Sequence, residues 1–126
     1  MSAATTDQPT PTGDGPEVWP PLIDSLQEQI PRLSPTDARI AMAIVADCRA
    51  RDRLGRERYG TPLRAHNGRD ALVDAYQEAL DLLAYLGQLA IERRHPERIT
   101  GLLNDATGMV TELRELLSER EVPYDP

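Results

Sequence analysis

The sequence predicts an all-α fold, a four-helix bundle-like domain, and two observations indicate it. Residues that favour helices dominate, only 4% of the chain is aromatic and Phe is absent, so Leu, Ile, Val and Ala must build the core. Four segments also repeat apolar residues at helical spacing. The 126 residues have room for one domain of ordinary size. We expect a disordered tail over residues 1–18, a helical domain over 19–121 and a C-terminal tail over 122–126.

The first helix is predicted to be short and bounded by prolines. The preceding residues are rich in Pro, Thr, Gly and Asp and have little to bury, which is typical of disorder. Trp19 at the edge of this tail is expected to fix it to the domain or to a partner subunit. Pro21 suits the first helical position, and apolar residues repeat from Leu22 to Ile30.

The second helix has the clearest start in the chain. Ser34 is the expected N-cap, Pro35 the first helical residue, and the helix should reach about Arg58. Its expected inner stripe contains one acid and one arginine among apolar residues, namely Ile40, Ala43, Ile44, Asp47, Arg51 and Leu54. Burying Asp47 without a partner would cost several kcal/mol. Either Asp47 pairs with Arg51, four residues on, or it has a role facing the acidic residues of the third helix.

The third helix is expected from Gly68 to Glu92, after a loop over residues 59–67, with Asn67 as N-cap. Most of its circumference is apolar, which indicates a central helix of a bundle. Its polar residues fall within a sector of roughly 80°. We call this the acidic stripe, and it consists of Asp70, Asp74, Glu78, Asp81 and Tyr85.

The last helix should begin at Pro96 and present an apolar seam in alternating steps of four and three residues. The seam is Ile99, Leu103, Ala106, Val110, Leu113 and Leu117, widened by Leu102, Met109 and Leu116. A face this broad is expected to close the bundle, or to pair with the same helix of another copy.

Charge and composition exclude several classes of partner. The formal net charge is −7, which argues against a nucleic-acid backbone and against an anionic membrane. The same charge opposes the hypothesis that the arginines bind nucleic acid. No signal peptide or run of ~18 apolar residues is visible, and the single cysteine, Cys48, cannot form an internal disulfide. We therefore expect a cytoplasmic protein.

The acidic stripe is a candidate metal site. Asp74, Glu78 and Asp81 follow one another on one face, where like charges repel unless water or a cation separates them. Oxygen ligands select Mg²⁺ or Mn²⁺ over Zn²⁺. The alternative is a solvated helix face. Seven of the fourteen arginines lie in residues 49–69, and among them Arg64 and Arg69 are best placed to contact a polyphosphate.

Residues 78–90, Glu-Ala-Leu-Asp-Leu-Leu-Ala-Tyr-Leu-Gly-Gln-Leu-Ala, resemble the metal-binding helix of the MazG-like superfamily of all-α nucleoside triphosphate pyrophosphohydrolases. The resemblance implies that Glu78 and Asp81 are Mg²⁺ ligands. The family has a Glu-x-x-Glu pair on the preceding helix, which this chain lacks. Either Asp47 and Asp74 replace that pair, or the site is degenerate. The chain also resembles small phage-encoded proteins over residues 58–81.

The leading hypothesis is hydrolysis of a nucleoside triphosphate to the monophosphate and pyrophosphate. Bound Mg²⁺ would polarise the phosphate oxygens and activate water. Arg64, Arg69 or His66 would neutralise the pyrophosphate, and Tyr85 would orient or stack on the substrate. We expect a homodimer or homotetramer with sites near the subunit interfaces. The alternative is a non-catalytic helical module for binding or oligomerisation, such as a phage-type inhibitor of a host protein.

Overall fold

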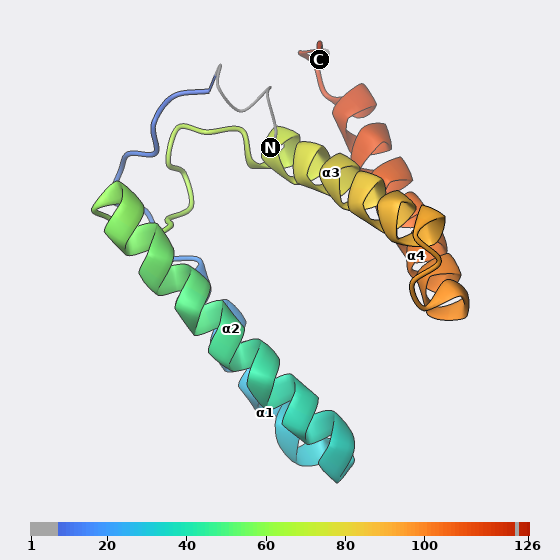
Figure 1. The fold of residues 1–126 in the computed structure, drawn as a ribbon. Helices are drawn as coiled ribbons and strands as arrows, with labels where there is room; N and C mark the ends of the chain where they lie inside the picture. The colour runs from blue at the N-terminus through green and yellow to red at the C-terminus, as the bar shows by residue number, and fades with distance from the viewer. Residues whose placement is uncertain (1–7, 123) are drawn as a thin grey trace. The chain divides into compact units, whose positions relative to one another are not determined.

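The computed structural model describes residues 8–122 and 124–126, and the predicted all-α class is confirmed (Figure 1). The elements of these residues are α1 (Trp19–Gln29), the 3₁₀ helix η2 (Ile30–Arg32), α2 (Pro35–Tyr59), α3 (Ala71–Ile91) and α4 (Pro96–Glu119). The chain forms two compact units, described separately below. The N-terminal unit is Thr10–Arg69, and the C-terminal unit is Asp70–Pro126, to which Gln8 and Pro9 also belong.

The N-terminal unit is a hairpin of α1 and α2. The Oγ of Ser34 accepts a hydrogen bond from the backbone N–H of Asp37 at 3.2 Å, so the predicted N-cap of α2 is confirmed. Gly60, at φ 71°, ends α2 in the left-handed conformation that glycine adopts without a steric penalty. α1 begins at Trp19, two residues before the predicted first position, Pro21, because prolines at the first positions of a helix lose no hydrogen bond.

The predicted inner stripe of α2 is wrong. The positions turned inward are Ala38, Ala41, Val45, Cys48 and Asp52, of which Val45 is buried and the others are half-buried. By contrast, Ile40, Ile44 and Leu54 are 57%, 47% and 49% exposed. Small side chains let α1 approach closely, so α1 packs on the side of α2 that has less apolar volume.

Asp47 is therefore not an inward-facing acid. Asp47 and Arg51 are both exposed, and among the described residues no ion pair joins them. An exposed carboxylate is stabilised by water, so the partner that burial would have required is unnecessary.

Residues 10–18 run beside residues 63–67, although their composition predicts disorder. Backbone hydrogen bonds join Thr12 N to Asn67 O, Ala65 N to Pro16 O and Val18 N to Leu63 O, at 2.8–3.0 Å. Trp19 is half-buried in the first turn of α1. The first seven residues of the predicted tail, 1–7, lie outside the described residues. Residues 10–18 and 63–67 are joined by hydrogen bonds between backbone groups, and amino-acid composition does not predict such bonds.

The C-terminal unit is an antiparallel hairpin of α3 and α4. Its core contains Leu86, Ile99 and Ala106, and Leu83, Leu89 and Leu103 pack against them. The predicted seam of α4 is confirmed, since all six of its residues are buried or half-buried and Leu117 is 0% exposed. The three residues that widen it are about half exposed.

The N-cap of α3 is Asp70 rather than Asn67. The Oδ1 of Asp70 accepts a hydrogen bond from the backbone N–H of Val73 at 3.2 Å, whereas the Oδ1 of Asn67 accepts one from Arg69 N at 3.0 Å. Asn and Asp are both favourable N-cap residues, so residue type alone could not show that α3 begins at Ala71 and not closer to Asn67. Within the described residues, every helix is too short or too polar to cross a membrane.

Candidate functional site

The acidic stripe lies on α3, and its members have different surroundings. Both carboxylate oxygens of Asp70 accept hydrogen bonds at the start of the helix. The Oδ1 caps α3, and the Oδ2 accepts a hydrogen bond from the Nη1 of Arg120 at 2.5 Å. This ion pair ties the end of α4 to the start of α3.

The pKa of Asp70 lies below its ordinary value. Partial burial raises the pKa, but the hydrogen bonds from Arg120 and from the backbone N–H of Val73 together outweigh that effect. The two hydrogen bonds therefore stabilise the charged form of the carboxylate.

Asp74 is bound to the N-terminal segment. The Nε2 of Gln8 donates to the Oδ1 of Asp74 at 2.7 Å, and the Oε1 of Gln8 accepts from the backbone N–H of Asp70. Sequence reasoning missed Gln8 because it lies in a stretch with the composition of a disordered tail. Only a search for side chains that bridge two acids could have found it.

Glu78 and Asp81 are the two carboxylates of the stripe with no such partner. Within the described residues neither forms a side-chain hydrogen bond or an ion pair. Glu78 is exposed and Asp81 half-buried. Their spacing of three residues makes them neighbours on the helix surface, with Cβ atoms roughly 5–6 Å apart. Tyr85, 59% exposed, follows one turn later.

A divalent cation is compatible with this pair, although the described residues contain no group of three or more His, Cys, Asp or Glu side chains that could hold one. Mg²⁺ is commonly held by one or two carboxylates together with water and substrate phosphates, not by a full protein cage. Glu78 and Asp81 supply oxygen donors of this kind. Asp74 already accepts a hydrogen bond from Gln8 at its Oδ1.

The other residues predicted for the site belong to the N-terminal unit. The Nη1 of Arg64 donates to the carbonyl of Gly15 at 3.0 Å, so Arg64 holds the paired segments together. Arg69 is half-buried, and His66 is exposed at φ 56°. Asp47 is exposed on α2.

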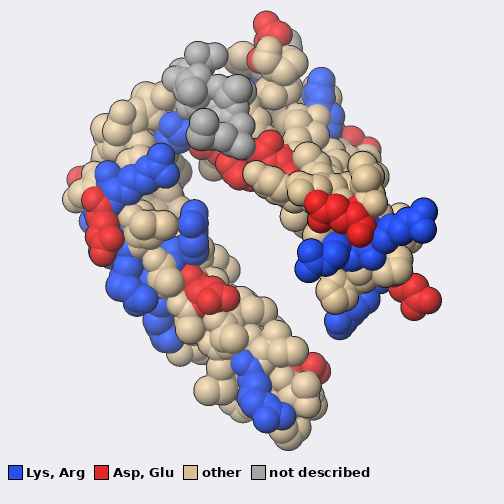
Figure 2. Space-filling model, viewed as in Figure 1, with Lys and Arg blue, Asp and Glu red and all other residues tan. Residues whose placement is uncertain are grey.

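Arginines form a basic surface along α2 (Figure 2). Arg56 is paired: its Nε donates to Asp52 at 2.9 Å and its Nη2 to Glu17. These hydrogen bonds, to Asp52 first and then to Glu17, raise the pKa of Arg56 above its ordinary value. Arg56 thus connects α2 to the segment that precedes α1.

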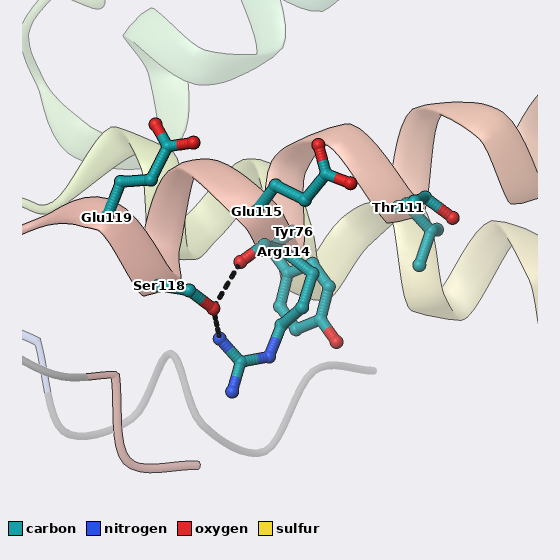
Figure 3. A pocket seen from close by; sticks show the side chains of 7 residues that line it. Tyr76, Thr111, Arg114, Glu115, Ser118 and Glu119 are labelled. Carbon is teal, nitrogen blue, oxygen red and sulfur yellow. Dashed lines mark hydrogen bonds between the residues drawn. The ribbon is translucent and has the colours of Figure 1, made fainter.

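An open pocket of about 460 Å³ lies on the C-terminal unit (Figure 3). Arg114 bends toward Ser118, and its Nη1 donates to the Ser118 Oγ at 2.9 Å. Tyr124 packs on both Arg114, at 5.5 Å from the ring centroid, and Tyr76, with ring centroids 5.6 Å apart. Within this pocket the side chains of Arg114 and Ser118 bind each other, and the Ser118 Oγ also donates to the carbonyl of Arg114.

Comparisons with known proteins leave the family open. No protein-family model matches the chain, and no curated protein or solved structure shows significant similarity to it.

Proposed function

We propose that this chain is a Mg²⁺-dependent nucleoside triphosphate pyrophosphohydrolase, as its resemblance to the MazG-like superfamily implies. The observation that carries the proposal is the pair Glu78 and Asp81, adjacent on α3 and without protein partners among the described residues. Asp70 and Asp74, on the same stripe, are bound elsewhere in the fold. Two carboxylates and the phosphates of a substrate match the coordination that Mg²⁺ prefers.

The role of each group follows from its chemistry. Glu78 and Asp81 would hold the metal, which when bound supplies Lewis acidity toward the phosphate oxygens. The hydroxyl and ring of Tyr85, exposed one turn later, are available to a sugar or base. Arg64, Arg69, His66 and Asp47 belong to the N-terminal unit, and the proposal assigns them no contact with this pair. A homodimer or homotetramer with sites near the subunit interfaces is part of the proposal.

The test is release of pyrophosphate from nucleoside triphosphates by the wild-type chain with Mg²⁺ or Mn²⁺. Glu78→Gln should abolish turnover, because the amide removes the charge that holds the metal, while helicity measured by circular dichroism stays unchanged. Glu112→Gln is the matched control, an exposed glutamate on α4 that should retain wild-type turnover. Full activity of Glu78→Gln would overturn the proposal.

A second candidate function is a non-catalytic helical binding module, such as a phage-type inhibitor of a host protein. The observation that favours it is the set of half-exposed apolar side chains on α4, Leu102, Met109 and Leu116. Exposed apolar groups that follow one another along a helix are typical of a docking surface. Absence of turnover together with stable capture of a folded partner would favour this function.

A further inference from the structure

Two columns of apolar residues run along the α3–α4 hairpin beside its core. On α3 the column is Ala75, Leu82 and Leu89, and on α4 it is Leu102, Met109 and Leu116. Each advances in steps of seven residues, which is the repeat of helices that pack in bundles. Leu82, Leu102, Met109 and Leu116 are 41–52% exposed, and Ala75 is exposed as well. We call these six positions the paired columns.

Helix geometry places both columns on one face of the hairpin. At 100° per residue, each column lies roughly 80° from the inward direction of its helix. α3 and α4 are antiparallel (Figure 1). Two equal displacements therefore bring the columns to the same side. The core contacts of the hairpin also set its register. With helices of equal rise, this register pairs Leu89 with Leu102, Leu82 with Met109, and Ala75 with Leu116.

The opposite face of the hairpin has a different composition. There α4 presents polar residues, Thr107, Thr111, Arg114 and Ser118, beside the exposed Leu80 of α3. The apolar surface that both helices share is therefore confined to the face with the paired columns.

We propose that a second copy of this chain covers this face, with the two α3–α4 hairpins forming a four-helix bundle about a two-fold axis. In this arrangement α3 of one copy lies against α4 of the other, antiparallel as within the hairpin. The paired columns then form three layers of four side chains, two from each copy. Apolar residues at two core positions and one flanking position per heptad are the pattern of bundle helices.

The area of the face fits this partner. Helices of 21 and 24 residues are about 32 and 36 Å long at 1.5 Å per residue, and packed helices lie 8–10 Å apart. A hairpin face of this size covers roughly 600 Å², so two copies together bury about 1,200 Å², the lower bound for a stable interface.

The charges beside the columns predict how salt affects the dimer. Level with the layers of the columns, the charged residues exposed just outside them are Glu78 on α3 and Asp105 and Glu112 on α4, and each is acidic. The basic Arg98 lies one turn before Leu102, beyond the last layer. In a dimer of identical faces these like charges meet at the rim, so screening by salt should tighten association. A basic partner protein on the same face would instead bind more weakly as salt increases.

The experiment is sedimentation equilibrium of the full chain over a range of concentrations, at low and high salt. The wild-type chain should form dimers of its 14.0 kDa monomer that tighten with salt. Leu82→Glu should raise the dimer Kd roughly 100-fold or more, since each interface would bury two carboxylates. Leu80→Glu is the matched control: its side chain is 39% exposed against 41% for Leu82, but it lies on the opposite face.

A second pair of variants distinguishes loss of the dimer from loss of folding. Met109→Glu should dissociate the dimer and Thr111→Glu should not, with equal helicity by circular dichroism. A wild-type chain that stays monomeric at every concentration would overturn the proposal, as would equal dissociation of Leu80→Glu and Leu82→Glu. All four variants keep Glu78 and Asp81, so metal binding by this pair can be measured in them separately from dimer formation.

Discussion

Single residues decide how the acidic stripe is used. Asp70 caps α3 and pairs with Arg120, Asp74 binds Gln8, and only Glu78 and Asp81 are left without a protein partner among the described residues. The four carboxylates look equivalent in the sequence because spacing alone places them on one face. Their difference comes from Gln8 and Arg120, which are distant in the chain and carry no pattern of their own.

Replacement of Asp70 should separate its cap from its ion pair. Asp70→Ala should cost about 1 kcal/mol of unfolding free energy, because it removes the N-cap. Asp70→Asn keeps a cap and should cost a few tenths of a kcal/mol, since the pair with Arg120 is partly exposed. Chemical denaturation at pH 7 measures both values.

The cost of Asp70→Asn should depend on pH in a fixed direction. The pKa of Asp70 is lowered in the folded state, so the unfolded chain binds the proton more tightly and stability rises with pH in that range. The contribution is fully present above the unfolded pKa of about 4 and is lost as pH falls through the folded pKa. A difference between wild type and Asp70→Asn that stays constant from pH 7 to pH 3 would contradict this assignment.

Gly15 and Gly108 should respond to alanine with opposite signs. A Cβ on Gly15 would lie 2.2 Å from the carbonyl oxygen of Ala65, a backbone atom, so Gly15→Ala must separate the paired segments. No atom lies within 4 Å of a Cβ on Gly108, inside α4, so Gly108→Ala should stabilise the chain by roughly 0.5–1 kcal/mol. Hydrogen exchange should show faster exchange of the Ala65 and Val18 amides in Gly15→Ala alone.

At the scale of elements, the sequence predicted the helices well and the packed face of α2 badly. Ser34 and Pro35 mark the start of α2, and the seam of α4 follows from spacing. On α2 the bulky residues Ile40 and Ile44 suggested the inner face, but packing with α1 uses small residues beside Val45. Hydrophobicity ranks faces by apolar volume, whereas two helices pack where their surfaces can approach.

The same limit applies to the candidate site. Helical spacing was enough to group Glu78, Asp81 and Tyr85 on α3. The hydrogen bond from Arg64 to the carbonyl of Gly15 could not be predicted, because it depends on the pairing of residues 10–18 with residues 63–67. Interactions within one helix are visible as a sequence period, while those between distant segments are not.

At the scale of the whole molecule, the charge is divided unequally. Residues 70–126 contain twelve acidic side chains and five arginines, a formal charge of −7, while residues 10–69 contain eight acids and nine arginines, a charge of +1. An acidic hairpin attracts cations and repels its own copy at low salt. A divalent cation held by Glu78 and Asp81 would reduce that repulsion.

The most direct test of the central claim is calorimetric titration of Mg²⁺ and Mn²⁺ into the full chain with a non-hydrolysable nucleoside triphosphate present. The account predicts binding by the wild-type chain, loss of that binding in Asp81→Asn, and wild-type binding in Asp105→Asn, where an exposed aspartate of α4 is neutralised. Absence of metal binding by the wild-type chain, or equal binding by Asp81→Asn, would contradict the account and leave the acidic stripe as a solvated face of α3.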